Sequence, residues 1–379
     1  MPGIPIEILR EIFKLCFDSP LNVFEAFEFP WHLGHICSRW RVLFFSLRST
    51  FWNRIIINQC VLWQERFAED VEEMVTFFLE RTCGRPFSFH FDVAEGYTSY
   101  ARPILVNLIV HSEQWEEVSI GLWPSQFGYL CGAKGRLSLL NKLDIHYDVG
   151  RDEDYGGAGN AIRSMVANTF EDAPLLTHVV LHTPSPWQFK FNWSLLTMVT
   201  LQHYSNIPNN ILPVLRKTIN LVELTIQHMP LNDLDNEGDG LVHLPHLERL
   251  SINRLAFLTI LETPSLQRLT IDFTLSQPSL DDTGVIVPFF RRSEIELTTL
   301  VLKHGPAAIV KEILRFTPKI YKLVLLEIFD TADVFEWLAG TGTQLQEPRC
   351  SNLNVLWGYL TPEGVRNVLG PLHDIIARR

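Results

Sequence analysis

The chain has 379 residues, of which 46% are hydrophobic and 20% are charged, so it can bury a large core. Its formal net charge of −11 argues against sequence-independent nucleic-acid binding, which needs clustered Lys and Arg, and against binding to an anionic membrane surface. We therefore expect neither nucleic acid nor a membrane among its partners.

The N-terminal segment shows no secretory or membrane-spanning pattern. Charged residues (Glu7, Arg10, Glu11 and Lys14) interrupt its apolar positions, and no uncharged apolar run approaches the roughly 18 residues that cross a bilayer. The six cysteines are scattered, mostly among apolar neighbours: Cys16, Cys37, Cys60, Cys83, Cys131 and Cys350. This usage is typical of buried thiols in a reducing compartment rather than of a disulfide framework, and it predicts a cytoplasmic or nuclear protein.

The first predicted helix covers roughly residues 6–17. Its apolar side chains recur at helical spacing, at Ile8, Leu9, Ile12 and Phe13. Pro5 suits the first turn of a helix, where its missing N–H would be unpaired anyway, and Asp18-Ser19-Pro20 ends the segment.

Three more helices are predicted along the first quarter of the chain. The second runs from about Leu33 to Leu47, and a short third one begins near Ser49-Thr50, where either residue suits an N-cap. A fourth covers residues 65–81, with an apolar stripe that ends just before Gly84.

Three short stretches in this region together resemble one known module, the F-box. They are Pro5-x-Glu7-Ile8-Leu9-x-x-Ile12-Phe13, then Cys37-Ser38-x-Trp40-Arg41, then Phe51-Trp52-x-x-Ile55. The F-box is a small three-helix module that docks its protein onto a ubiquitin-ligase scaffold, and several fungal families carry a version of this pattern. An amphipathic helix alone is ordinary core material, so it is the ordered combination that carries the resemblance.

The resemblance implies a set of residues that contact the ligase adaptor. Carried over, they are Pro5, Ile6, Leu9, Ile12 and Phe13 on the first helix, and Ile36, Trp40 and Leu43 on the second. Ile4 stands where the family usually has Leu, and the loop over residues 18–30 is longer than a compact F-box needs.

From about Trp115 the chain repeats the pattern apolar-x-x-apolar-x-apolar. The copies are Trp115/Val118/Ile120, Leu140/Leu143/Ile145, Leu176/Val179/Leu181, Leu196/Val199/Leu201, Leu221/Leu224/Ile226, Leu247/Leu250/Ile252, Leu266/Leu269/Ile271, Leu297/Leu300/Leu302, Ile320/Leu323/Leu325 and the trace Leu353/Leu356. The mean step of about 26 residues is that of leucine-rich repeats. Each repeat would bury its apolar side chains against its neighbours, since a single unit cannot cover its own apolar face.

The array resembles leucine-rich repeats in period and strand motif, although the Asn or Cys usual after the strand is not regular here. The predicted fold is therefore α/β: a small N-terminal three-helix F-box, then an irregular leucine-rich-repeat solenoid with parallel strands on the concave face and helices and loops outside. The predicted domains are residues 1–59 (F-box), 60–113 (helical linker or N-terminal cap) and 114–379 (repeat array).

Side chains that flank the buried pair in each strand should point to the opposite, concave face. Those predicted to contact a target protein are Asp144, His146, Thr200, Gln202, Thr225, Gln227, Ser251, Asn253, Thr270, Asp272 and Lys303. Their hydrogen-bonding character suits a protein-binding surface, and it equally suits a merely solvated sheet face.

We expect no metal, no cofactor and no catalytic residues. His32, His35 and Cys37 lack a second cluster to complete a tetrahedral site, and His178 and His182 fall in a predicted strand rather than on a metalloprotease helix. The acidic loop at residues 233–238 lacks the Glu that a calcium loop needs at its twelfth position, and the glycine run at residues 156–159 follows an acidic patch.

The F-box resemblance implies a non-catalytic substrate receptor of a Skp–cullin–F-box ubiquitin ligase. The N-terminal helices would dock onto a Skp-family adaptor, and through it the cullin, while the repeat array holds a target protein. Two alternatives stay open. One is a repeat scaffold with no ligase role, in which the face carrying Pro5, Leu9 and Phe13 packs inward. The other is an enzyme with its site in the inter-repeat loops, for which the sequence offers no sign.

Overall fold

In the computed structural model the described residues are 4–15, 20–22, 31–47, 52–58, 68–92, 98–147, 168–183, 189–202, 211–227, 240–274, 284–339, 350 and 352–359. The chain forms two compact units, Met1–Leu195 (unit 1) and Leu196–Arg379 (unit 2), which are taken here in turn. Both are α/β, with parallel strands and helices packed on the sheet.

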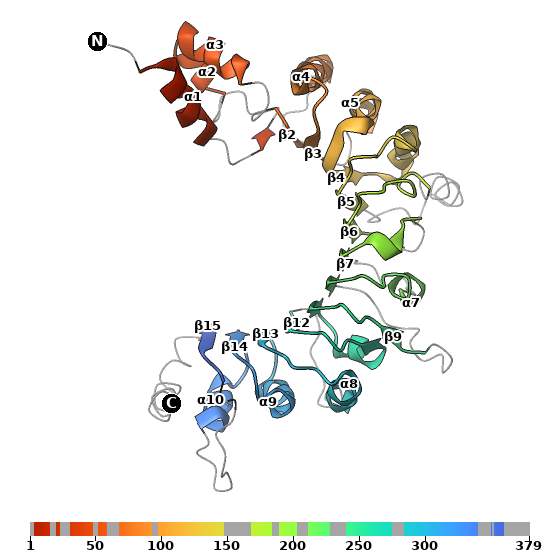
Figure 1. Ribbon diagram of the computed structural model, residues 1–379, viewed down its shortest axis with the longest axis vertical. Helices are drawn as coiled ribbons and strands as arrows, with labels where there is room; N and C mark the ends of the chain where they lie inside the picture. Colours follow the sequence, from red (N-terminus) through yellow and green to blue (C-terminus); the bar gives the residue numbers. More distant parts are fainter. Residues whose placement is uncertain are drawn as a thin grey trace. The chain divides into compact units, whose positions relative to one another are not determined.

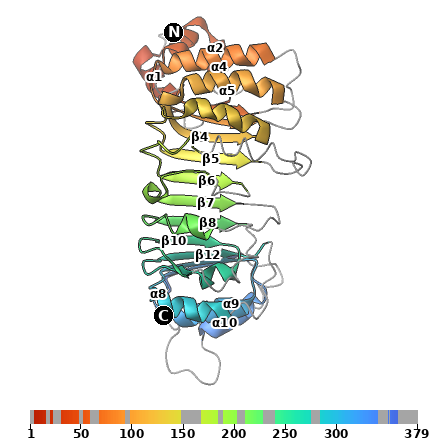
Figure 2. The same ribbon diagram turned by 90° about the vertical axis from the view of Figure 1, so that its right-hand side faces the viewer.

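Unit 1 contains a parallel sheet in which each strand pairs with the next strand along the chain. The strands are β1 (Leu21–Asn22), β2 (Arg54–Asn58), β3 (Phe87–Asp92), β4 (Trp115–Leu122), β5 (Lys142–Tyr147) and β6 (His178–His182). Parallel neighbours need a crossover connection, because the chain must return to the same end of the sheet before each new strand. Figure 2 shows β4, β5 and β6 side by side in this order.

The helices of unit 1 supply these crossovers and the N-terminal block. They are α1 (Ile6–Leu15), α2 (Leu33–Ile36), α3 (Ser38–Ser46), α4 (Ala68–Thr82) and α5 (Thr98–Val110), with 3₁₀ segments η2 (Ser112–Gln114), η3 (Pro124–Ala133) and η6 (Trp193–Leu195). In Figure 1, α4 and α5 lie on one side of the strands β2 to β4. The opposite face of the sheet is therefore the one on which polar side chains can gather.

The predicted N-terminal helices are only partly confirmed. The first is observed as α1, but the second is two helices, because Cys37 has an extended backbone that separates α2 from α3. The third predicted helix was to begin near Ser49-Thr50, which lie outside the described residues. Where the structure is described again, residues 54–58 form the strand β2 and not a helix, so the prediction is wrong there. The fourth is confirmed as α4.

Every copy of the repeated sequence pattern coincides with a strand. The register pairs equivalent residues, as for Val118 with Leu143 and Leu250 with Leu269. Two earlier copies were missed, Trp52/Ile55/Ile57 at β2 and Phe89/Phe91 at β3, although Ile55 pairs with Phe89 in the same register. The segment 60–113, expected to be helical, thus contains a strand as well. The predicted domain boundaries themselves stay a prediction.

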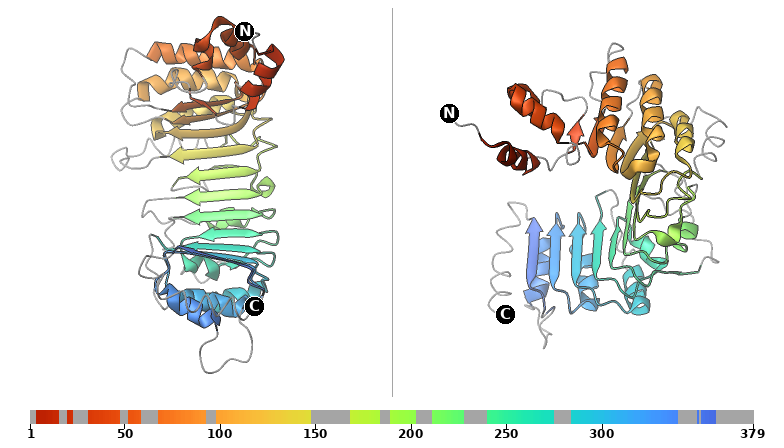
Figure 3. Two further views of the ribbon diagram at one scale, coloured as in Figure 1. Left: turned by 90° about the vertical axis from the view of Figure 1, so that its left-hand side faces the viewer. Right: turned by 45° about the horizontal axis from the view of Figure 1, so that its top comes forward.

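Unit 2 continues with strands of the same kind. The main sheet has the order β7 (Met198–Gln202), β8 (Glu223–Gln227), β10 (Arg249–Ile252), β12 (Arg268–Asp272), β13 (Thr299–Lys303), β14 (Lys322–Leu326) and β15 (Val355–Tyr359), and β9 (Val242–His243) pairs separately with β11 (Leu261–Glu262). The right-hand view of Figure 3 shows β12 to β15, from turquoise to blue, as arrows of one direction.

Helices also pack on the sheet of unit 2. They are α7 (Leu212–Leu215), α8 (Ile286–Ser293), α9 (Ala307–Phe316) and α10 (Thr331–Ala339), with the 3₁₀ segment η7 (Leu255–Thr259). The helix α9 buries Ile309, Val310 and Ile313 at helical spacing, and its charged side chains lie on the other side. Across the described parts of both units, none of the helices combines the length and apolarity of a membrane span.

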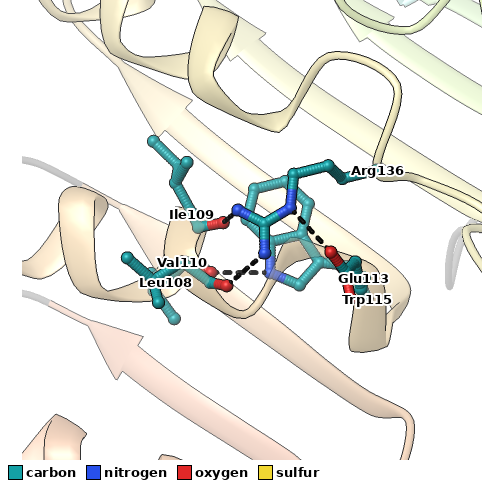
Figure 4. Close-up of polar contacts among 6 residues, drawn as sticks. All are labelled: Leu108, Ile109, Val110, Glu113, Trp115 and Arg136. Carbon is teal, nitrogen blue, oxygen red and sulfur yellow. Dashed lines mark hydrogen bonds and ion pairs between the residues drawn. The ribbon is translucent and has the colours of Figure 1, made fainter.

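One cap explains how α5 ends before β4 (Figure 4). The last carbonyls of a helix have no partner within it. Here the indole Nε1 of Trp115 donates to the carbonyl of Leu108 at 3.1 Å, and the Arg136 guanidinium donates to the carbonyl of Val110 at 2.6 Å. Arg136 also pairs with Glu113 at 3.1 Å, so one cation holds both the helix end and the turn that follows it.

Candidate functional site

Helix α1 buries few of its apolar side chains. Only Leu9 and Phe13, one turn apart, are buried, with 2% and 1% of their surfaces exposed. We call the exposed apolar residues of α1, together with Ile4 just before it, the α1 apolar surface; they are between 36% and 81% exposed: Ile4, Ile6, Ile8, Ile12 and Leu15. Ile8, Ile12 and Leu15 recur at helical spacing on one side of α1, and exposed apolar side chains grouped in this way mark an interaction site more often than an isolated one does.

The eight predicted adaptor contacts divide into two groups. Pro5, Ile6, Ile12 and Ile36 are exposed. Trp40 is half-buried, and Leu9, Phe13 and Leu43 are buried.

The burial of Leu9, Phe13 and Leu43 corrects their prediction as adaptor contacts, because they form the core of the N-terminal block and present no surface to a partner. Phe13 packs edge-on against Trp40, with ring centroids 5.1 Å apart. Sequence reasoning missed exposed apolar neighbours, namely Ile8, Leu15 and Val42, since helical spacing alone does not say which apolar side chains pack inward.

The N-terminal block is held to the rest of unit 1 by an aromatic cluster. Trp52, which is fully buried, lies 5.2 Å from Phe78 of α4 and 5.9 Å from Phe44 of α3, measured between ring centroids. The Arg39 guanidinium donates to the carbonyl of Ile4 at 2.8 Å and so fixes the start of α1 against α3. Trp52 thus packs within the fold, whereas the α1 apolar surface, Ile36 and Val42 are exposed.

On the sheet face of unit 1, three side chains from β5 and β6 meet. Asp144 and His146 are two residues apart on β5, so they point to the same face, and His182 pairs with His146 across the ladder. His146 Nε2 lies 3.0 Å from Asp144 Oδ1, and His182 Nε2 lies 3.7 Å from the same oxygen. The two imidazole rings stack with centroids 3.9 Å apart. We call these three residues the Asp–His–His cluster.

A chain of polar contacts leads to this cluster from β3 and β4. The Ser119 hydroxyl donates to Asp144 Oδ2 at 3.4 Å, and it lies 2.9 Å from His90 Nδ1. A hollow of about 260 Å³ on the same face is lined by His90, Ser119 and Asp144, and also by Arg54 and Lys142. The face therefore carries charges of both signs around a hollow that apolar residues such as Pro20 and Ile56 also line.

The electrostatics of the two histidines differ. The Asp144 carboxylate beside it raises the pKa of His146 above its ordinary value, and Asp92 adds to this effect. Burial lowers the pKa of His182, and the neighbouring His146 lowers it further. The two imidazoles therefore differ in proton affinity although they lie beside the same carboxylate.

In unit 2 the predicted face residues form two columns across neighbouring strands. Thr200, Thr225, Ser251 and Thr270 stand in register and are all half-buried. In the adjacent column the Gln202 amide Nε2 donates to Gln227 Oε1 at 2.9 Å. A hollow of about 400 Å³ lies over β8, β10 and β12 and includes Thr225, Ser251 and Thr270 among its lining residues.

The charged side chains of this second face contact one another. Arg249 Nε lies 2.7 Å from Glu223 Oε2, and Lys303 Nζ lies 3.3 Å from Asp272 Oδ2. Burial would raise the pKa of Asp272, but hydrogen bonds from Thr274 and the Lys303 ammonium outweigh it and lower that pKa. Asn253 differs from the others because only 5% of its surface is exposed, so it is not available for contact.

The structure gives no support to the other candidate sites named from the sequence. His32, His35 and Cys37 are exposed and, in the described part of the chain, form no group with converging ligand atoms. The acidic loop at 233–238 and the glycine run at 156–159 lie outside the described residues. Cys37 and Cys83 are exposed rather than buried, Cys131 is half-buried and Cys350 is buried, and none of these four forms a disulfide.

Comparison with known proteins does not assign this chain to a family. No protein-family model matches this chain, and a search of curated proteins finds no relative. The features of this chain that bear on function are therefore the α1 apolar surface and the sheet faces.

Proposed function

We propose that this protein is a substrate-receptor subunit of a Skp–cullin–F-box ubiquitin ligase, with no catalytic residues of its own. The N-terminal helices dock onto a Skp-family adaptor, and the sheet faces of the repeat units hold a target protein. Such a receptor accelerates ubiquitin transfer by proximity, since it keeps the target near the conjugating enzyme. This role places the protein in the cytoplasm or the nucleus.

The α1 apolar surface carries this proposal. Ile8 and Ile12 are 54% and 40% exposed on a helix whose buried apolar side chains, Leu9 and Phe13, already fill the local core. Covering such side chains with a partner gains about 25 cal/mol for each Å² of apolar surface removed from water. The resemblance of the surrounding residues to the F-box names the partner.

The second part of the proposal depends on the polar sheet faces. The leucine-rich-repeat resemblance is supported by the register, in which the buried residues of successive copies lie opposite one another in neighbouring parallel strands. The alternate side chains, such as Thr225 and Ser251, then face away from that core as a regular set of hydrogen-bonding groups. A protein target supplies complementary groups over an area of this kind.

The alternative function, a repeat scaffold with no ligase role, is favoured by one observation. It predicted that the face with Pro5, Leu9 and Phe13 packs inward, and Leu9 and Phe13 do so. Pro5 remains exposed, as do the neighbours that form the α1 apolar surface.

A co-purification experiment separates the two functions. The full chain is produced with a Skp-family adaptor, beside the variant Ile8→Glu/Ile12→Glu. The matched control is Val106→Glu/Val110→Glu, a pair of exposed valines at the same spacing on α5. We expect the first variant to lose at least about 1.4 kcal/mol of adaptor binding, a tenfold weakening, and the control to bind as the wild type does.

Two results would contradict the proposal. One is a folded wild-type chain that does not bind the adaptor. The other is equal binding by the two double variants, which would show that the α1 apolar surface is not the contact. Circular dichroism of each variant establishes that it is folded.

A further inference from the structure

The Asp–His–His cluster is a set of metal-ligand groups brought together by the sheet. One ligand atom from each of Asp144, His146 and His182 lies within 4.8 Å of the other two. Two imidazoles and one carboxylate are a donor set that Zn²⁺ accepts, with a fourth position left for water or another ligand. Cu²⁺ and Ni²⁺ also bind imidazole, so the chemistry points to a late transition metal rather than to Mg²⁺ or Ca²⁺.

A second observation concerns Asp144 itself. Its Oδ1 atom is buried, and its partners are the two imidazoles: His146 Nε2 forms an ion pair with it at 3.0 Å, and His182 Nε2 lies 3.7 Å away. A buried carboxylate oxygen is costly to leave without a charged partner, and in this cluster both imidazole nitrogens approach the same oxygen. A cation among the three groups would satisfy it.

The neighbouring strands orient and charge the cluster. The Ser119 hydroxyl holds the other carboxylate oxygen, Oδ2, and His90 contacts that hydroxyl in turn. Outer contacts of this kind fix the direction of a metal-binding carboxylate. On the adjacent column, Gly121 separates Asp92 from His146; a Cβ at this position would collide with the Asp92 carboxylate. The missing side chain leaves room for a second negative charge beside the site.

We propose that Asp144, His146 and His182 bind a divalent transition-metal ion of the Zn²⁺ class, with one coordination position open on the exposed sheet face of unit 1. The stacked rings are nearly parallel, 13° apart, and a metal must lie in the plane of each ring it binds. Binding therefore turns one ring. His146 is free to do so, since 42% of its side chain is exposed, against 21% for His182.

This site differs from the sequence expectation of no metal. The sequence drew attention to His178 and His182, which are four apart, but the ligand that meets His182 comes from the preceding strand. His146 lies opposite His182 only because β5 and β6 pair in this register. The proposal is independent of adaptor binding, so either can fail without the other.

The test is a calorimetric titration of the full-length, chelator-treated chain with Zn²⁺, beside absorption spectra with Co²⁺ as a probe of coordination geometry. We expect one high-affinity site in the wild type, and a loss of about 100-fold or more in affinity in His182→Gln and in Asp144→Asn. The matched control is His178→Gln on the same strand, which should bind as the wild type does.

Two results would overturn the proposal. The first is a folded wild-type chain with no site tighter than the scattered surface histidines provide. The second is Zn²⁺ binding by His182→Gln that equals that of His178→Gln. Thermal unfolding in the absence of metal checks that the variants are folded, and the Co²⁺ spectrum distinguishes ligation by the cluster from loose surface binding.

Discussion

The sheet faces of the two units are built on one strand pattern but carry different chemistry. In unit 1 the face gathers imidazole and carboxylate groups around Asp144, whose Oδ1 is approached by the Nε2 atoms of both His146 and His182. In unit 2 opposite charges contact each other, as Glu223 does Arg249, and the amides of Gln202 and Gln227 join across strands.

The difference teaches that position in the repeat does not determine what a face can bind. Both sets of side chains occupy the same outward positions of equivalent strands. In unit 1 a ligand would complete an arrangement, whereas in unit 2 a ligand must replace contacts that already exist. We therefore expect substitutions in the Asp–His–His cluster to change metal binding, and substitutions in the charge pairs of the second face to change stability slightly.

The largest effect expected from this comparison is at Ser119. Replacing it with Ala removes the hydroxyl that holds Asp144 Oδ2 without removing a metal ligand. We expect Zn²⁺ affinity to fall by about 10-fold, the lower end of the range for outer contacts of a metal site. Calorimetric titration measures the change, and Ser251→Ala on the other face serves as the control. Equal Zn²⁺ affinity in Ser119→Ala and wild type would show that the hydroxyl does not orient the carboxylate.

A smaller effect is expected from the charge pairs of unit 2. Arg249→Met keeps much of the aliphatic side chain but removes the 2.7 Å contact with Glu223. Because both side chains are partly exposed, we expect a loss of only about 0.2–1 kcal/mol in the free energy of unfolding. Urea unfolding at low and high salt checks this. The loss should shrink as salt is added, and a loss that salt leaves unchanged would point to packing instead.

The smallest effect concerns pH and Asp272. Its pKa is lower in the folded protein than in the unfolded chain, so its ionised form stabilises the fold above the unfolded value of about 3.9. This contribution is lost as the pH falls through the folded pKa. The stability difference between wild type and Asp272→Asn should therefore shrink below about pH 4. Urea midpoints at neutral pH and at pH 3 measure it, and a difference that grows on acidification would reverse the predicted sign.

The strand array was largely predictable because its signal is local. Each strand buries an apolar pair two residues apart, as Leu224 and Ile226 do, and this alternation is visible in the sequence. The copies at β2 and β3 were missed for two reasons: Trp52 was assigned to the helical block, and Phe89 and Phe91 replace the usual Leu and Ile. At β2 and β3, tertiary packing rather than helix propensity determines that the segments form strands.

The candidate sites were less predictable because they depend on non-local pairing. Asp144 and His146 were expected on the outward face, but nothing in their spacing to His182 shows that β5 and β6 place them together. At α1 the difficulty was different. Every apolar residue of an amphipathic helix fits the pattern, and only the packing against α3 shows that Leu9 and Phe13 are inside while Ile8 and Ile12 are outside.

The constant register of unit 2 has a geometric consequence. Leu250 and Leu269 are paired although they are 19 residues apart, and Leu323 and Leu356 are paired at 33 residues apart, so differences in repeat length leave the strand spacing unchanged. Neighbouring strands lie about 4.8 Å apart, and an extended peptide advances about 3.3 Å per residue. Three residues of an extended ligand thus match two strands, so residues i and i+3 of such a ligand would lie over Thr225 and Thr270 with their side chains on opposite faces of the ligand.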